Sequence, residues 1–365
     1  MFRPTKAYVD LQHIRSNYRA LKNLIGNGFF CPMVKANGYG HGDVMVVKAI
    51  VEEGANRVGV ALVEEGIHLR ESGILIETLV FGRLSLASAK AVVEYGLTPV
   101  LSSWADLEIL SQLPASPAFH IKINTGMNRM GFPLEDVKRL RDHLAAEKKL
   151  KCIGVCTHLS HGNDADDENG RSEKQIRLFH RIFEQLGRPE LLHHVLNSEG
   201  LLIRSKVKND CEWLGARPGL ALYGLCESPL VKPAMSLHTA VDIVRRVPKG
   251  ESISYGGRWT ASKDSWVAVV PLGYGDGYWR SFSNRAHMLF RERRVPVVGT
   301  VCMDYSLLDL TAACDEGEPR LGEDVVVFGS QGKSSMSVIE LTKLSHTIPY
   351  ELVTNLNIRV PRVYR

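Results

Sequence analysis

The sequence lacks the features that would place a protein in a membrane or outside the cell. No apolar stretch is long enough to span a bilayer, and the first residues, MFRPTKAYVDLQHIRSNYRALKNL, carry charges throughout and have no apolar signal core. The seven cysteines are odd in number and scattered, which is typical of reduced thiols rather than of a disulfide framework. We therefore expect a cytoplasmic protein with no membrane partner.

Metal-binding modules and concentrated charge are missing as well. No paired Cys/His module is present, and Cys152 and Cys156 fall on one apolar run, which favours a core role, so we predict no metal site. The net charge is +5, but the basic residues are dispersed. That distribution argues against a nucleic-acid partner and supports only a weak attraction for small anions.

Two stretches look like ligand-binding loops but fail at required positions. NDADDENG has the acidic alternation of a calcium loop, yet Asn169 occupies the position of the turn glycine and Gln175 that of the terminal acid. FGSQGKSS ends like a phosphate-binding loop, but Val327 stands where the first glycine belongs. We expect a solvated loop before a helix in the first case and a β-turn in the second.

The pattern of the 365 residues changes once along the chain, which indicates two domains. From about Phe29 to Tyr223, eight short apolar runs alternate with amphipathic segments; the runs are FFCPMV, RVGVAL, ETLVFG, TPVLS, AFHIKI, KCIGVCTH, HHVLNS and EWLGAR. We expect helices from Asp43, as the N-cap, to Gly54, and over about Leu62–Ser72, Leu86–Tyr95, Trp104–Gln112, Leu134–Ala146 and Ser172–Leu186.

This alternation predicts an α/β fold with an N-terminal (β/α)8 TIM-type barrel over 9–230, and a doubly wound open sheet is the competing arrangement. Pro32 inside the first run is unusual for a central strand. After about Val231 the runs AVDIVRRV, SWVAVVPLG, RRVPVVGTVCMDYSLLDL and DVVVFG are β-rich and separated by Gly and Pro turns. They predict a C-terminal all-β domain over 231–365.

Polar residues follow the predicted barrel strands at the ends where such barrels place their chemistry. They are Lys35, Lys122, Asn124, Arg129, His158, Asn197, Ser198, Arg217 and Gly219. Each alone has a structural explanation, such as a solvated lysine, a hydrogen-bonded core histidine or a surface ion pair. Their convergence on one rim of the barrel favours a functional site.

The residue types at this rim suit carbonyl chemistry. A lysine at a partly desolvated barrel mouth can lose its proton near neutral pH and attack a carbonyl. Ser198 and the backbone near Gly219 follow strands seven and eight, where barrels often hold a phosphate. This combination fits pyridoxal phosphate, and it fits a sugar-phosphate aldolase as well.

Longer motifs narrow the choice. VKANGYGHG resembles the cofactor-lysine motif of the alanine racemases, the fold-type III pyridoxal enzymes, and the similarity continues through KINTGMNRMG, CTHLS, NSEG, RPGLALYG, SYGGRW, PLGYGDGY, VGTVCMDY and IPYELVTNLNIRVPRVY. The resemblance implies a pyridoxal 5'-phosphate-dependent isomerase that interconverts L- and D-alanine and supplies D-alanine for peptidoglycan precursors. It also implies a head-to-tail homodimer, with the N-terminal strand 1–8 joined to the β domain.

The resemblance assigns roles residue by residue. It implies that Lys35 carries the cofactor and acts as one base, and that Tyr255 of the partner subunit is the opposite base. Cofactor-binding positions are implied for Tyr39, His158, Asn197, Ser198, Arg217, Gly219, Leu220 and Tyr350. Arg129 and the backbone at Met303 match the groups that receive the substrate carboxylate, Tyr274 matches a tyrosine at the entrance, and Lys122 matches a lysine that is often carbamylated.

General chemistry agrees with these roles. Racemisation removes the α-proton from one face and returns a proton to the other, so two opposed bases are the natural solution. Tyrosine has an unperturbed pKa of about 10 and needs cationic neighbours to act as a base. Arg217 only donates hydrogen bonds and therefore disfavours protonation of the pyridine nitrogen. This favours a racemase over a decarboxylase of the same architecture, in which an acidic residue stands there.

The substrate range stays open at this point. Asn124 stands where relatives often have aspartate and Asn128 where they often have glycine, and both lie between Lys122 and Arg129 in the sequence. This leaves open whether Lys122 is carbamylated, uncarbamylated or countered by an anion. Alanine is the expected substrate. The alternatives are a racemase for serine, basic or a broader range of amino acids, a fold-type III decarboxylase, and a non-catalytic cofactor-binding protein.

Overall fold

The computed structural model describes residues 3–315 and 317–365, which divide into two compact units. We call Ile14–Lys232 the barrel unit. The β unit consists of the stretch up to His13 together with Pro233–Arg365. Residues 1–2 of the expected N-terminal strand lie outside the described residues.

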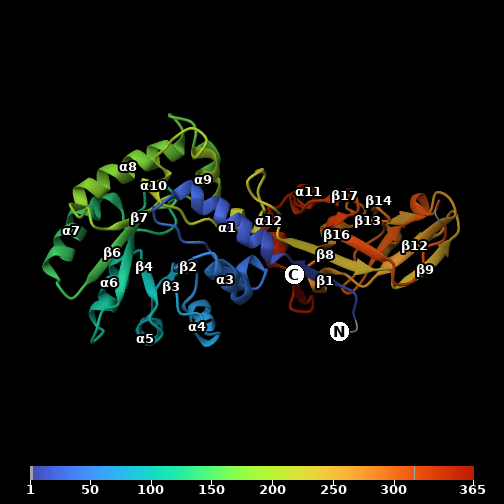
Figure 1. The fold of residues 1–365 in the computed structure, drawn as a ribbon. Helices are drawn as coiled ribbons and strands as arrows, with labels where there is room; N and C mark the ends of the chain where they lie inside the picture. The colour runs from blue at the N-terminus through green and yellow to red at the C-terminus, as the bar shows by residue number, and fades with distance from the viewer. Residues whose placement is uncertain (1–2, 316) are drawn as a thin grey trace. The chain divides into compact units, whose positions relative to one another are not determined.

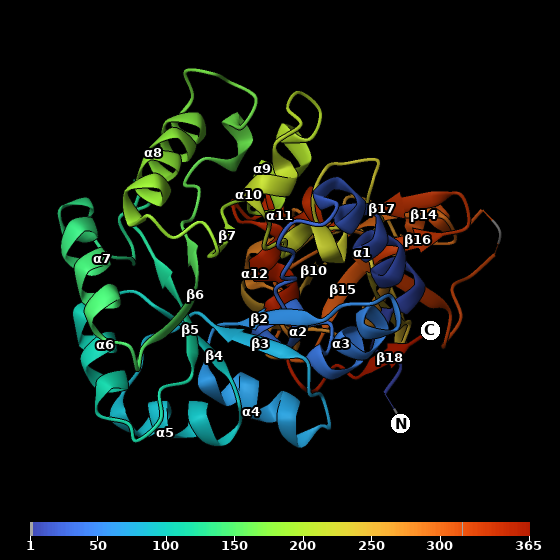
Figure 2. The ribbon, with the colours of Figure 1, turned by 60° about the vertical axis from the view of Figure 1, so that its left-hand side comes forward.

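Six parallel strands form the sheet of the barrel unit, paired in chain order. They are β2 (Arg57–Val60), β3 (Glu77–Val80), β4 (Thr98–Leu101), β5 (Ala118–Lys122), β6 (Lys151–Cys156) and β7 (Leu192–His194). Most of their residues are apolar and buried, as in other parallel sheets that helices cover. Figures 1 and 2 show α4–α8 on the outer side of these strands.

Isolated bridges close the sheet into a barrel. After β7, Leu196 pairs with Ala216, and Ala216 pairs in turn with Phe30. Met33 then pairs with Gly59 of β2. The predicted barrel is therefore confirmed, although isolated bridges stand in place of its first and last strands. Pro32 has no N–H, yet its carbonyl accepts from Gly59 N at 2.9 Å, which lets the chain pass through a central position.

The run EWLGAR was predicted as a strand, but only its end is extended backbone that pairs with the barrel. A helical turn, α10 (Cys211–Leu214), occupies its first half, and the ladder begins only near Ala216. Gly215 lies between them at φ +61, and a Cβ there would stand 2.4 Å from the carbonyl oxygen of His193. The strand prediction for 212–214 was wrong because tertiary packing of this turn overrides a short apolar pattern.

Helices connect the strands at the expected places. The helical segments of this part of the chain are α1 (Leu11–Ile25), α2 (Lys35–Tyr39), α3 (Asp43–Glu52), α4 (Val63–Glu71), α5 (Leu86–Glu94), α6 (Trp104–Ser111), η1 (Leu134–Asp136), α7 (Val137–Ala146), η2 (Gly162–Asp164), α8 (Arg171–Leu186), α9 (Ser198–Arg204) and η3 (Leu220–Tyr223). Gly42, rather than Asp43, is the N-cap of α3.

The two stretches that resemble ligand loops form a loop before a helix and a turn between strands, as predicted. The Asp164 carboxylate of NDADDENG accepts the N–H groups of Arg171 and Ser172 at the start of α8. FGSQGKSS forms the end of β16 (Asp324–Gln331) and its turn into β17 (Ser334–Met336). Cys152 and Cys156 are buried free thiols, and Cys156 packs in a core cluster with Phe29.

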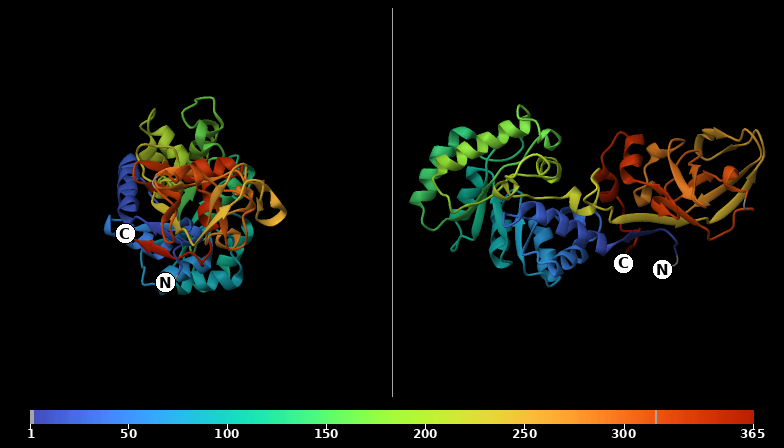
Figure 3. Two further views of the ribbon diagram at one scale, coloured as in Figure 1. Left: turned by 90° about the vertical axis from the view of Figure 1, so that its right-hand side faces the viewer. Right: turned by 45° about the horizontal axis from the view of Figure 1, so that its top comes forward.

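The β unit is rich in strands. Its largest sheet has the order β14-β13-β16-β8-β1-β18, with β17 paired to β16, and smaller sheets have the orders β15-β12-β9 and β10-β11. The remaining bounds are β1 (Lys6–Val9), β8 (Met235–Ala240), β9 (Ile243–Val247), β10 (Ser252–Ile253), β11 (Trp259–Thr260), β12 (Ser265–Val270), β13 (His287–Phe290), β14 (Arg293–Pro296), β15 (Ser306–Asp309) and β18 (Arg362–Tyr364). Figure 3 shows most strands of this unit in orange and red.

Strand β1 joins the β unit because it pairs antiparallel with β8 and parallel with β18, the last strand of the chain. Short helical segments complete the unit: η4 (Tyr255–Gly257), η5 (Tyr274–Asp276), η6 (Arg280–Phe282), η7 (Thr311–Ala313), α11 (Val338–Leu344) and α12 (Pro349–Thr354). In the described part of the chain, every helix is too short or too polar to cross a bilayer.

Candidate active site

Lys35 precedes a backbone turn in the left-handed conformation. The four residues after it have positive φ: 53° at Ala36, 53° at Asn37, 59° at Gly38 and 51° at Tyr39. Left-handed backbone costs roughly 1–2 kcal/mol for each residue with a Cβ, and asparagine tolerates it best. The strain is concentrated directly beside Lys35, and such strain occurs most often at functional sites.

The Lys35 amine is half-buried. Burial and the positive charge of Arg129 lower its pKa below the usual lysine value, while the Glu65 carboxylate raises it. A lysine with a lowered pKa has more of the neutral amine that attacks carbonyls.

A group of hydrogen-bond donors and hydroxyls follows β7 and the Leu196–Ala216 bridge in the chain. The Ser198 hydroxyl accepts the N–H groups of Gly219 at 3.0 Å and Ala221 at 3.2 Å. Gly219 lies against Tyr39, because a Cβ added to Gly219 would stand 2.2 Å from the Tyr39 hydroxyl. Asn197 caps α9 by accepting the N–H of Gly200 at 2.8 Å. Leu220 is buried at the start of η3.

Arg217 is held tightly at the bottom of this group. Its guanidinium donates to the carbonyl oxygens of His194 and Thr157, each at 2.5 Å, and contacts His158 Nδ1 at 3.2 Å. Only 5% of Arg217 is exposed. Among the described contacts, Arg217 has no carboxylate partner. Neutral acceptors therefore hold the guanidinium in place, and its positive charge is not compensated by an ion pair.

A second histidine extends this network into the barrel interior. Arg217 Nη1 donates to His194 Nδ1 at 2.6 Å, and His194 Nε2 lies 2.9 Å from His120 Nδ1. Arginine cannot accept, so neutral His194 carries its proton on Nε2 and donates it to His120. His120 Nε2 is buried and has no partner in the described residues.

His120, His194 and His158 are all kept neutral. Burial, followed by the charge of Arg217 or Arg57, lowers the pKa of His120 to about 3, and burial and Arg217 lower the pKa values of His194 and His158 well below the ordinary value. His120 and His194 were not predicted as site residues. The signal that would have found them is a histidine in the interior of an apolar barrel strand, which needs a partner.

Lys122 is buried among cations at the end of β5. Burial is the largest cause that lowers its pKa, and the charges of Arg217, Arg129 and Lys35 lower it as well. Arg129 itself is exposed, in a loop that begins at Asn124. The Asn124 side chain organises this loop by donating to Asn128 Oδ1 and accepting the N–H groups of Gly126 and Asn128.

The remaining predicted residues belong to the β unit. Tyr255 is 73% exposed and Met303 53%, while Tyr274 and Tyr350 are about two-fifths exposed, at 43% and 39%. Tyr274 and Met303 lie on neighbouring loops, since Tyr274 N donates to the carbonyl of Cys302 at 3.0 Å. These side chains are presented at a surface rather than enclosed by their own unit.

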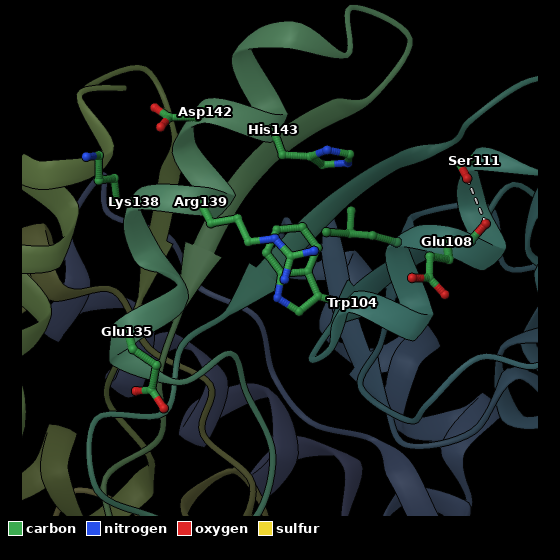
Figure 4. A pocket seen from close by; sticks show the side chains of 9 residues that line it. Trp104, Glu108, Ser111, Glu135, Lys138, Arg139, Asp142 and His143 are labelled. Carbon is green, nitrogen blue, oxygen red and sulfur yellow. Dashed lines mark hydrogen bonds between the residues drawn. The ribbon is translucent and has the colours of Figure 1, made fainter.

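A separate pocket lies elsewhere in the barrel unit, between α6 and α7 (Figure 4). It has a volume of about 640 Å³, and the Arg139 guanidinium stacks over the Trp104 ring at 4.0 Å. None of the predicted site residues lines it. Its acidic and basic side chains alternate, so it offers no consistent charge to a ligand.

The chain resembles known families over its whole length. It matches the family models for the alanine racemase N-terminal domain over residues 9–227 and the alanine racemase C-terminal domain over residues 234–364. The alanine racemase of Carboxydothermus hydrogenoformans is 37% identical, covering 99% of this chain and 100% of the relative. That of Symbiobacterium thermophilum is 38% identical, covering 99% and 97%.

Solved structures agree with the sequence matches. The alanine racemase from Bacillus anthracis with bound L-Ala-P superimposes with a TM-score of 0.89 at 31% identity, covering 100% of this chain and 96% of that one. The alanine racemase from Bartonella henselae with covalently bound pyridoxal phosphate gives a TM-score of 0.89 at 25% identity, covering 99% of each chain.

Proposed function

Because the chain belongs to the alanine racemase family, we propose that it interconverts L- and D-alanine with pyridoxal 5'-phosphate as cofactor. The observation that carries the proposal is the partly desolvated Lys35, with its lowered pKa, at the end of a barrel that also presents Ser198, Gly219 and Arg217. Its proposed role is to supply D-alanine for peptidoglycan precursors in the cytoplasm.

The residues of the barrel unit fit this cofactor. Lys35 offers the amine that would bond to its aldehyde, and the Ser198 hydroxyl with the N–H groups around Gly219 and Leu220 would hold its phosphate, with Tyr39. We propose that Tyr350, of the β unit, contacts the phosphate as well. A side chain at Gly219 would collide with the Tyr39 hydroxyl, so glycine at this position lets Tyr39 lie close to the N–H groups that would hold the phosphate. When bound, the cofactor supplies the electron-withdrawing ring that makes the α-proton of the amino acid removable.

Arg217 determines which chemistry this ring favours. Arginine stays charged and has no acceptor, so it would donate to the pyridine nitrogen and keep that nitrogen unprotonated. The neutral His194 and the Thr157 carbonyl hold the guanidinium in place for this contact. An unprotonated ring withdraws electrons less strongly, which favours return of the proton over decarboxylation or transamination.

Two bases would then exchange the α-proton. Lys35 would act on one face and Tyr255 on the other. The 73% exposure of Tyr255 supports a site that a second copy of the chain completes, because its own unit leaves the phenol in solvent. We therefore propose a homodimer in which the β unit of one subunit gives Tyr255, Tyr274 and Met303 to the barrel of the other.

The carboxylate of the substrate would meet Arg129 and the backbone N–H of Met303. Lys122 supports this arrangement if it is carbamylated, since the modification changes a buried cation into an anion beside Arg129. Burial, followed by the charges of Arg217, Arg129 and Lys35, lowers the pKa of Lys122, which favours the neutral amine that reacts with carbon dioxide. Asn124 and Asn128 hold the Arg129 loop by hydrogen bonds that carry no charge.

The test is to incubate the purified protein and pyridoxal phosphate with a panel of L-amino acids and to separate the products by chiral chromatography. We expect D-alanine from L-alanine and L-alanine from D-alanine. Carbon dioxide with an amine would instead identify a decarboxylase. Conversion of serine or lysine in preference to alanine would overturn the proposed substrate but leave the racemase.

A further inference from the structure

The turn after Lys35 needs an external restraint. Four consecutive residues from Ala36 to Tyr39 have φ between 51° and 59°, and three of them carry a Cβ. A chain released from restraint leaves this region of backbone conformation, and the direction of the preceding Lys35 side chain then changes with it. The question is which group holds the turn in place.

The segment makes local hydrogen bonds of its own, such as Gly40 N to the carbonyl of Ala36 at 2.9 Å. Glu65, in the first turn of α4, adds a contact from a different element. Its Oε1 accepts the N–H of Ala36 at 2.6 Å, the first amide after Lys35. Its Oε2 accepts the N–H groups of Ala61 at 2.7 Å and Leu62 at 3.0 Å, in the segment between β2 and α4. One half-buried carboxylate therefore joins the strained turn to a rigid strand end and helix start.

We propose that Glu65 is the positioning residue for Lys35: by accepting the Ala36 N–H it holds the left-handed turn, and so fixes where the lysine amine meets the cofactor. This inference rests on the proposed function, because it gives Lys35 the task of holding pyridoxal phosphate. Hydrogen bonds to a charged acceptor are short and about twice as strong as neutral ones, which suits a carboxylate for holding strained backbone.

The same carboxylate acts on the charge of Lys35. Burial and Arg129 disfavour the protonated amine, and Glu65 is the group that opposes them. Glu64, the neighbouring residue, is exposed and has no hydrogen bond in the described contacts. It has the same charge and nearly the same position in the chain, and it therefore provides a matched control.

The first test is hydrogen exchange of the cofactor-free protein. In Glu65→Gln the amide can accept only through one oxygen, so we expect peptides covering residues 34–42 to exchange about 10-fold faster or more. In Glu64→Gln we expect no change in these peptides. Equal exchange in the two variants would overturn the proposal, and neither cofactor nor catalysis enters the measurement.

The second test relieves the strain directly. Glycine adopts positive φ without penalty, so Ala36→Gly in the Glu65→Gln background should restore most of an expected loss of about 10-fold in affinity for pyridoxal phosphate. If Glu65 only caps α4, exchange rises in residues 61–71 alone and Ala36→Gly restores nothing; that result would refute the proposal.

The two proposals can fail separately. Faster exchange and rescued cofactor binding without any racemisation would leave Glu65 as the positioning residue and reject the proposed function. Racemisation that is equal in Glu65→Gln and Glu64→Gln, with equal exchange, would keep the function and reject the role of Glu65.

Discussion

The two units present their candidate residues in opposite ways. In the barrel unit, Arg217 is 5% exposed and Ser198 4% exposed, and both make hydrogen bonds to other residues of the same unit. In the β unit, Tyr255 is 73% exposed and Met303 53% exposed. The difference teaches that the barrel unit encloses its candidate residues, whereas the β unit leaves its candidates at a surface, which is what the proposed dimer requires.

Replacement of the barrel's nucleophile should have the largest effect. Lys35→Ala removes both the anchor of the cofactor and one base, so we expect a loss on the order of 10⁴-fold in kcat. Borohydride reduction followed by peptide mapping should find pyridoxal phosphate bonded to Lys35 in the parent chain and nowhere in the variant. A cofactor fixed to another lysine would contradict the assignment.

Removal of the phenol from the β unit should come next. Tyr255→Phe removes one base without disturbing a core, so we expect a fall of about 10²- to 10⁴-fold in kcat with unchanged thermal stability. Tyr305→Phe, on the same unit and 43% exposed, is the control and should retain full activity. Unequal effects on the kcat values of the two directions, with the ratio of the two kcat/KM values unchanged, would sharpen the assignment of Lys35 and Tyr255 to opposite faces.

The same two variants test whether the β unit of one subunit completes the active site in the barrel unit of the other. Lys35→Ala and Tyr255→Phe proteins, unfolded together and refolded, should form hybrid dimers with one intact site. Random pairing would restore about a quarter of the parent activity. A refolded mixture as inactive as its components would exclude a site shared between subunits. Tyr255 would then either act within its own subunit or have no part in catalysis.

A smaller change is expected at Arg217. Arg217→Gln keeps donors for the carbonyls of His194 and Thr157 but loses the charge, and we expect a fall of about 10- to 100-fold in racemisation. Arg217→Glu should add side products, measured as pyruvate, because it favours a protonated ring nitrogen. Unchanged racemisation and unchanged pyruvate would refute the role given to this arginine.

The smallest effect concerns stability rather than activity. The folded protein lowers the pKa of His120 from 6.5 to about 3 through burial and then the nearby arginines, so the unfolded chain binds a proton on it throughout that pH window and the folded protein does not. Stability therefore falls as the pH drops below 6.5. His120→Gln should reduce this slope by about 1.4 kcal/mol per pH unit, measured by urea unfolding of cofactor-free protein.

Sequence reasoning found the residues at strand ends but missed those that hold them. Lys35, Ser198 and Arg217 follow apolar runs, which a reader of the sequence can locate. Glu65 is an ordinary residue of a helix start, and His120 is noticeable only as a polar side chain in an apolar strand, which does not reveal its partner. The Ala36–Glu65 contact joins positions 29 residues apart, and the His120–His194 contact joins positions 74 apart. No local pattern encodes such a contact.

The sequence by itself determined the alternation of strands and helices, the change to a β-rich second half and the motifs that name the family, because periodicity and motif spacing are local properties. Only the tertiary structure decided that the Lys35 turn is left-handed, that 212–214 is helical, and that two histidines stand behind Arg217. These features depend on which distant side chains meet in the closed barrel, and burial there leaves each polar group only the partners that the fold brings to it.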